Sequence, residues 1–244
     1  MRIISLVPSI TETLFDFGLT NIEIVGRTKF CIHPKNKVEK VAQIGGTKNI
    51  DVEKIKAINP DLIIANKEEN VKDQVEELMP YFPVWLTEID TLEDNTQFLK
   101  ELGKRLDKSE IANKWIEKVK DAFPQKILNK DLSYSYLIWK KPYMTIGHDT
   151  FIHHILERLG LKNTHIHQSR YPMIEISDME NSDFILLSTE PYPFQEKHKV
   201  ELLEQLPNKK IIIVDGEAFS WYGTHLARCK RYYQDLILQI EVLK

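Results

Sequence analysis

Two segments of the sequence combine large aromatic side chains with a few polar groups, which is how small-molecule sites are usually lined. The first, residues 139–150, includes Trp139 and Tyr143, and the second, residues 215–223, includes Trp221. Large apolar side chains in loops are costly unless something covers them. Both segments therefore predict either contact with a ligand or a packing corner between two lobes.

A third segment, residues 28–34, mixes an aromatic ring, a thiol and an imidazole. Cys31 and His33 could ligate a metal ion, but a zinc site usually takes four protein ligands, or three and a water molecule. The alternatives are a loop packed against a sheet and an aromatic lining of a ligand site. Arg170 and the tyrosine after it could add a cation and another ring to such a site.

The sequence contains no recognisable catalytic set. It lacks the G-x-S-x-G, H-E-x-x-H, Walker and G-x-G-x-x-G patterns. Ser9 and Glu12 have the spacing of a capping box, and Glu12 already supplies the negative charge that an anion would bring to this helix start. These patterns indicate binding without a reaction.

Alternating strand-like and helix-like segments must position these residues. In the first half we expect strands at 3–7, 23–26, 62–65 and 84–86, and helices at 9–18, 51–58, 70–79 and 92–106. In the second half we expect strands at 134–139, 184–187 and 211–214, and helices at 150–159, 195–205 and 222–243. Strands separated by helices indicate mainly parallel sheets, whose ligand-facing loops follow the carboxyl ends of the strands.

The chain also repeats one pattern. Residues 59–61 (Asn-Pro-Asp) lead into an apolar strand, and residues 181–183 (Asn-Ser-Asp) do so again half of the chain's 244 residues later. Two helix ends, at 17–21 and 159–163, are also alike, each with Gly-Leu followed two residues later by Asn. Two similar α/β units predict a two-lobed protein with a ligand cleft between the lobes.

We expect an N-terminal lobe over residues 1–107, a linking helix over 108–128 and a C-terminal lobe over 129–244. Apolar residues recur at helical spacing up to Phe123, and Pro124 should kink or end that helix. A helical link is stiffer than a Gly/Ser linker, which predicts small lobe motions.

Composition excludes several classes of protein. The net charge is −3 with both signs interspersed, so nucleic acid is not an expected partner. No apolar run approaches the ~20 residues of a membrane span. The two cysteines stand in opposite halves, and we expect free thiols. The opening apolar run breaks at Pro8 without a cleavage site, so it is better interpreted as a first core strand than as a signal sequence.

Residues 3–12 (IISLVPSITE) and 59–65 (NPDLIIA) resemble the class III, helical-backbone periplasmic substrate-binding proteins of ABC importers for vitamin B12, iron siderophores and haem. Gly45 and Gly46 stand where many members carry a glycine turn. The resemblance covers essentially the whole chain. It implies an α/β fold of two Rossmann-like lobes with mainly parallel sheets, joined by one long backbone helix.

The resemblance also implies that the ligand lies between the lobes and contacts strand-exit loops of both. Carried over position by position, it implies ligand-binding residues in the first lobe, namely Phe30, Asn66, Lys67 and Glu68. In the second lobe it implies Trp139, Tyr143, Glu190, Tyr192, Phe219 and Trp221, to which the sequence adds Arg170.

The first lobe is most similar to the cobalamin binders, with two departures. Asn66 stands where those proteins have an aromatic residue, and Lys72 stands where they present a permease-docking glutamate. The metal-ion branch of the family uses histidines at strand exits, for which His33 and His148 are the candidates, but the full ligand set is not evident.

We therefore expect a monomeric substrate-binding protein of an ABC import system that holds a cobalamin, ferric siderophore or haem-like chelate without catalysis. It needs no cofactor, although the ligand itself can contain cobalt or iron. An ABC permease is the expected partner if the chain is exported. The alternatives are a cytosolic sensor or carrier of the same fold and a metal-dependent two-lobed enzyme. The resemblance implies a periplasmic location, and the absence of a leader before Met1 would imply a cytoplasmic one.

Overall fold

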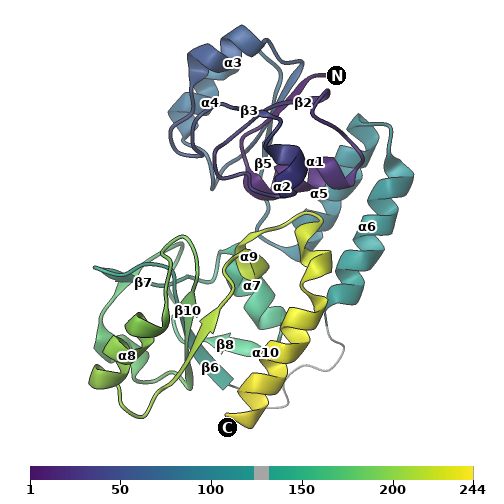
Figure 1. Ribbon diagram of the computed structural model, residues 1–244. Helices are drawn as coiled ribbons and strands as arrows, with labels where there is room; N and C mark the ends of the chain where they lie inside the picture. The colour runs from purple at the N-terminus through teal and green to yellow at the C-terminus, as the bar shows by residue number, and fades with distance from the viewer. Residues whose placement is uncertain (124–131, 244) are drawn as a thin grey trace. The chain divides into compact units, whose positions relative to one another are not determined.

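A computed structural model describes residues 1–123 and 132–243, and Figure 1 traces them through two compact units. The first unit consists of Met1–Ile89, Glu93–Val119 and Trp221–Leu226, and the second of Asp90–Leu92, Lys120–Ser220 and Ala227–Lys244. Pro124 and the predicted end of the linking helix, 124–128, lie outside the described residues. In the part of the chain that the structure describes, no helix is long and apolar enough to cross a bilayer.

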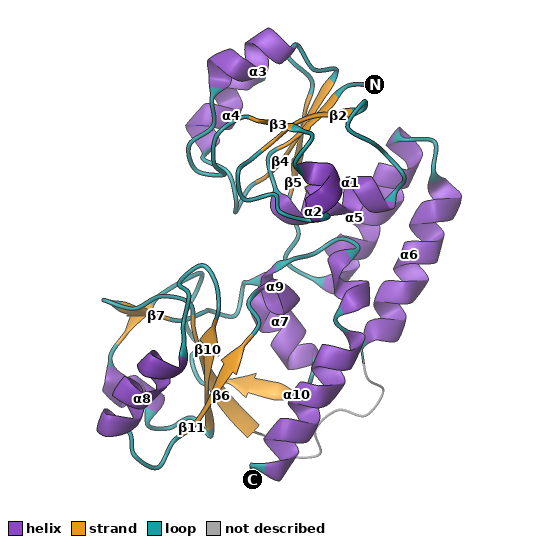
Figure 2. Ribbon diagram, in the orientation of Figure 1, coloured by secondary structure: helices purple, strands orange, loops and turns teal. Residues whose placement is uncertain are grey.

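The first unit is built on a five-stranded parallel sheet in the order β3-β2-β1-β4-β5. Its strands are β1 (Ile3–Ser5), β2 (Ile24–Arg27), β3 (Ala42–Gln43), β4 (Leu62–Asn66) and β5 (Val84–Thr87). Its helices are α1 (Pro8–Asp16), α2 (Lys35–Val38), α3 (Val52–Ile58), α4 (Lys72–Leu78), α5 (Leu92–Arg105) and α6 (Ser109–Ala122), the last of which ends in the second unit. Helices α3 and α4 cover one face of the sheet, where Ile55 and Leu78 pack on Ile63 (Figure 2).

The second unit has a four-stranded parallel sheet in the order β11-β10-β6-β8. Its strands are β6 (Leu132–Leu137), β8 (Leu161–Asn163), β10 (Phe184–Ser188) and β11 (Lys210–Val214), and a separate antiparallel pair joins β7 (Tyr143–Met144) to β9 (Met173–Ile174). Its helices are α7 (Phe151–Arg158), α8 (Glu196–Gln205), α9 (Glu217–Ser220) and α10 (Lys230–Val242), with a 3-10 turn at Ile176–Met179; a second 3-10 turn, His225–Arg228, begins in the first unit and ends in the second. Leu202 of α8 packs on Ile185 on one face, and Phe219 of α9 packs on Tyr136 on the other.

The repeat in the sequence is a repeat in the fold. In each sheet the first strand is central, the second pairs on one side of it, and the third and fourth follow on the other side, with β3 as an extra edge strand. The matching aspartates accept equivalent hydrogen bonds in the two sheets. Asp61 Oδ2 accepts the backbone N–H of Arg2 at 2.6 Å, and Asp183 Oδ2 accepts that of Ser133 at 2.7 Å. Each aspartate thus fastens its strand to the start of the central strand, and the predicted fold class is confirmed.

Two predicted helices begin at different residues in the structure. Pro8 takes the first helical position of α1, where its missing N–H costs nothing, so the N-cap is Val7 and Ser9 lies inside the helix. The predicted capping box with Glu12 is therefore wrong. The last predicted helix, 222–243, begins only at Lys230. Residues 221–226 instead join the first unit, where Gly223 adopts a φ of 76° that a helix does not allow.

The hydrogen bond from Ser133 predicts a pH dependence. The backbone N–H of Ser133 lowers the pKa of the Asp183 carboxyl below its usual 3.8 because it favours the charged form. The ionised Asp183 carboxylate therefore stabilises the fold at pH values above 3.8. This contribution is lost as the pH falls through the lowered pKa. We expect the unfolding midpoint in urea to fall less steeply with acid in Asp183→Asn than in the wild type. Asp235→Asn, at an exposed helix site, should keep the wild-type slope, and equal slopes in all three proteins would contradict the prediction.

Candidate functional site

In the first unit, one buried amide ties together three strand-exit loops. Asn70 Nδ2 donates to the carbonyl of Leu6, after β1, at 3.2 Å and to that of Thr47, after β3, at 3.1 Å. Asn70 itself follows β4, and its Oδ1 accepts the backbone N–H of Asn66 at 2.9 Å. The carboxyl ends of neighbouring parallel strands meet at one sheet edge, so these loops form a connected surface there.

Of the three predicted residues after β4, Asn66 is buried and shapes the loop. Its Oδ1 accepts the backbone N–H groups of Glu68 at 2.9 Å and Glu69 at 3.3 Å, and its Nδ2 donates to Thr87 Oγ1 at 3.2 Å. Lys67 pairs with Glu88, and both side chains are more than half exposed. Glu68 is half-buried and its carbonyl accepts a hydrogen bond from the Lys48 ammonium. Lys67 is therefore the exposed charge of this loop.

The loop after β2 presents apolar side chains and buries its thiol. Phe30 is 50% exposed, with the Lys29 ammonium 5.0 Å from its ring centre, and Ile32 is 48% exposed. Cys31 is buried, and Thr11 Oγ1 donates to its Sγ at 3.0 Å. Burial raises the pKa of this thiol. Among the residues described, no three His, Cys, Asp or Glu side chains gather as a metal site.

Trp221 lies in the first unit, although the sequence analysis assigned it to the C-terminal lobe. Its indole is 7% exposed, and its ring centre lies 5.4 Å from that of His33 and 5.1 Å from that of His225. The neighbouring Tyr222 packs edge-on against Phe98 at 6.3 Å. The aromatic segment thus packs against the β2 loop through the contact of Trp221 with His33. The exposed side chains of that loop are Phe30 and Ile32.

Three successive residues fasten this segment. The backbone N–H of Gly223 donates to Asn95 Oδ1 at 2.5 Å, and that of Thr224 donates to Thr13 Oγ1 at 3.1 Å. His225 Nδ1 lies 2.7 Å from Oε2 of Glu12. Because Glu12 and Thr13 are neighbours on α1, that helix holds Thr224 and His225, while Asn95 of α5 holds Gly223.

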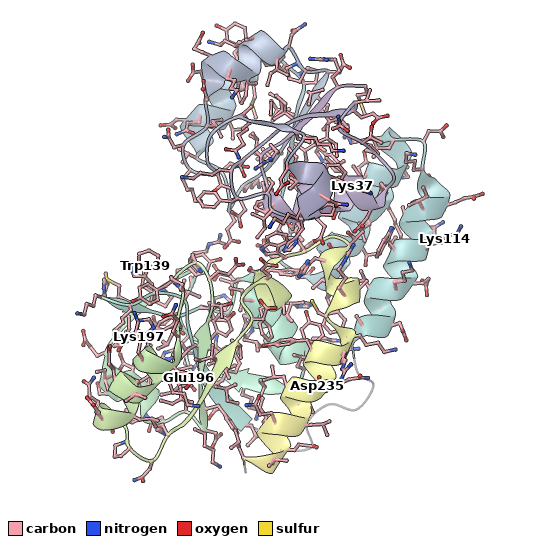
Figure 3. The ribbon with its side chains drawn as sticks, in the orientation of Figure 1. Lys37, Lys114, Trp139, Glu196, Lys197 and Asp235 are labelled. Atoms are coloured by element: carbon pink, nitrogen blue, oxygen red, sulfur yellow. The ribbon has the colours of Figure 1, made fainter. Side chains whose placement is uncertain are left out.

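In the second unit, Trp139, Tyr143 and Tyr192 gather beside the β7–β9 pair. Trp139 is 41% exposed and meets the Tyr192 ring edge-on at 5.6 Å; Figure 3 labels it beside this strand pair. The Tyr192 hydroxyl lies 3.3 Å from Nε2 of His198. Tyr143 and Tyr192 both pack against the apolar cluster that includes Ile185 and Leu202. Partial burial raises the pKa of Tyr143. These three predicted residues form an aromatic patch with one strongly exposed ring.

The remaining predicted residues lie in different surroundings. Glu190 Oε1 accepts a hydrogen bond from Ser220 Oγ at 2.7 Å. Phe219 is completely buried, in contact with the rings of Tyr136 and Tyr233. The Arg170 guanidinium donates to the carbonyl of Asp149 at 3.2 Å. His148 is exposed in this second unit, whereas His33 belongs to the first.

Sequence reasoning missed two residues beside the β2 loop, Glu12 and His225. Glu12 was interpreted as a helix cap, and His225 fell inside a predicted helix. The available signal was Pro8, because a proline favours the first helical position and thereby frees Glu12 from a capping role.

Comparisons with known proteins agree with this fold. Residues 3–204 match the sequence model of the periplasmic binding protein family. The chain is 27% identical over 186 residues to the vitamin B12-binding protein of Vibrio campbellii, which covers 73% of this chain and 66% of that protein. It is 28% identical over 176 residues to the uncharacterized ABC transporter substrate-binding lipoprotein YvrC of Bacillus subtilis, which covers 66% and 54%. The matches thus span just under two thirds and about half of these relatives.

Among solved structures, the periplasmic vitamin B12-binding protein BtuF of Vibrio cholerae superposes with a TM-score of 0.78. The superposition covers 98% of both chains at 18% sequence identity, so it shows a shared fold. The family match extends over most of the chain, through the first parallel sheet and through β6, β8 and β10 of the second. The chain therefore belongs to the periplasmic binding protein family.

Proposed function

We propose that the chain is the substrate-binding component of an ABC import system and that it binds a corrinoid or a similarly large metal chelate through exposed aromatic rings of its strand-exit loops. The observation that carries this proposal is the pair of half-exposed aromatic rings, Phe30 and Trp139, at strand exits of the two units. Aromatic rings of this kind supply contact area at low entropic cost. The names of the B12-binding relatives support the same class of ligand.

The two cations among the predicted site residues, Lys67 and Arg170, already have partners, which favours a large, mostly apolar ring system over a small anion as the ligand. Lys67 is paired with Glu88, and the Arg170 guanidinium already donates to the carbonyl of Asp149. Partnered charges orient polar groups at the edge of a ligand but add little attraction for a free anion. A corrin, porphyrin or siderophore chelate offers the broad face that the exposed rings can cover.

A titration tests this proposal directly. Cyanocobalamin, haemin and a ferric siderophore are added separately, and binding is followed by calorimetry and by tryptophan fluorescence. We expect one of them to bind with a Kd below roughly 10 μM, which corresponds to about −7 kcal/mol. Failure of all three to bind at that concentration would overturn the proposal.

Paired variants locate the site. Phe30→Ala and Trp139→Ala should each weaken binding by at least about tenfold, because each removes an exposed ring from the contact surface. Tyr81→Ala removes a ring that is 62% exposed in the first unit but lies beyond α4, away from the strand exits, and should bind as the wild type does. Equal weakening in all three variants would argue against the assigned site.

For location and partner, we propose a periplasmic protein that delivers its ligand, as a monomer, to an ABC permease. The family supports the location, and the B. subtilis relative, an ABC transporter substrate-binding lipoprotein, supports the partner.

A further inference from the structure

We propose that Glu12 is a positioning residue, which holds the His33 imidazole and the exposed β2 loop in place through His225 and Trp221. The inference rests on the proposed function and deepens it, because it identifies what keeps the first unit's ligand-facing loop in one conformation. Sequence and family arguments give Glu12 no such role. The contacts that provide this restraint begin on α1 and lead outward to the loop.

The first contact is a short bond in a nearly dry environment. Glu12 Oε2 and His225 Nδ1 are 2.7 Å apart, and the two side chains are 6% and 11% exposed. A hydrogen bond to a carboxylate is among the stronger ones in proteins, and a low local dielectric strengthens it further. The imidazole of His225 cannot turn about its Cβ–Cγ bond without breaking this contact.

The second step is a cluster of three rings. The Trp221 indole is inclined by 53° to the His225 ring and by 69° to the His33 ring, and the two imidazoles are 6.4 Å apart. Each ring therefore contacts the other two. With His225 fixed by Glu12, the indole has one fixed neighbour, and His33 packs against both the indole and His225.

The third step is that α1 holds the same loop at a second point. Thr11, the residue before Glu12, donates to the Sγ of Cys31 at 3.0 Å. Cys31 and His33 flank Ile32, so two adjacent residues of α1 restrain both neighbours of an exposed apolar side chain. A loop restrained in this way has less entropy to lose when a ligand covers Phe30 and Ile32.

The test combines a ligand-free signal with an affinity. The ring protons of His33, assigned with a His33→Gln variant in histidine-labelled protein, carry the ring-current shift of Trp221 in NMR spectra at one fixed pH. Glu12→Met keeps the side-chain volume but removes the acceptor, and we expect it to move the His33 resonances and to weaken chelate binding by roughly tenfold. Glu12→Gln retains an acceptor oxygen and should restore both readouts to within about threefold in affinity.

Glu53→Met, on the exposed face of α3, is the matched control and should change neither readout. Wild-type His33 resonances in Glu12→Met would overturn the inference, whether or not any chelate binds. Shifted resonances with unchanged affinity would also overturn it, because the restraint would then have no bearing on binding. If the wild type binds none of the three chelates, the proposed function fails, while the NMR comparison still decides whether Glu12 positions His33.

Discussion

Gly223→Ala is expected to lower the free energy of unfolding of the first unit by about 2–5 kcal/mol. Gly223 has a φ of 76°, which a residue with a side chain adopts at a cost of roughly 1–2 kcal/mol. A β carbon at this position would also lie 2.1 Å from Thr13 Oγ1 and 3.5 Å from the carbonyl oxygen of Ser9. The new methyl group therefore pushes against α1, the helix to which residues 224 and 225 are bonded.

Gly18→Ala separates the two causes. Gly18 has a φ of 83°, but a β carbon there would meet no atom within 4 Å, so only the backbone cost of roughly 1–2 kcal/mol should remain. Removing the Thr13 hydroxyl in the double variant Gly223→Ala/Thr13→Ala should recover part of the loss that the methyl group causes. Urea denaturation of the three variants and the wild type measures these differences. Equal losses at Gly18 and Gly223 would contradict the steric argument.

The repeated α/β architecture could be predicted because its signals are local. The apolar runs at 62–65 and 184–187 each follow an aspartate. They form the interior strands β4 and β10, and the aspartate bonds each strand to its neighbour. Apolar runs buried on both faces are typical of parallel strands, and helices between them leave few other topologies.

Other elements could not be predicted because their formation depends on distant partners. Strands β7 and β9 have two residues each and exist only as a pair formed across the 28 residues from 145 to 172 that separate them. The segment after Ser220 has helical periodicity in sequence, yet its backbone groups bond to Asn95 and Thr13 instead of to each other. Local propensity is a weak prior that such tertiary contacts override.

The candidate site shows the same division. Strand-exit loops could be located from strand ends, so Phe30 and Trp139 were selected for their position and are indeed exposed rings. Phe219 was selected on the same grounds but is completely buried against Tyr136. A phenylalanine at a strand exit has the same sequence signature in either case, because its burial is decided by helices that pack on it from elsewhere in the chain. The contribution of these residues to ligand binding stays a prediction.

Trp221→Ala is expected to lower the free energy of unfolding of the first unit by about 3–5 kcal/mol. The indole is 7% exposed and packs against both His33 and His225, so its removal leaves a cavity that the restrained segment 223–225 cannot close. Ligand affinity should fall as well, because His33 and the β2 loop lose the surface on which they rest. Trp221→Phe keeps an aromatic ring in the same place and should lose less than half as much stability.

Phe30→Ala is the matched variant in the β2 loop, three residues before His33. Its ring is 50% exposed, so its removal should cost less than about 1 kcal/mol of stability while it weakens chelate binding. Urea denaturation, which measures stability, and calorimetric titration, which measures ligand affinity, should therefore separate the two variants. Trp221→Ala should be impaired in both measurements and Phe30→Ala almost solely in binding. A Trp221→Ala protein with wild-type stability would mean that the indole is not a structural support of the loop, and Trp221 would then be assigned, like Phe30, to direct contact with the ligand.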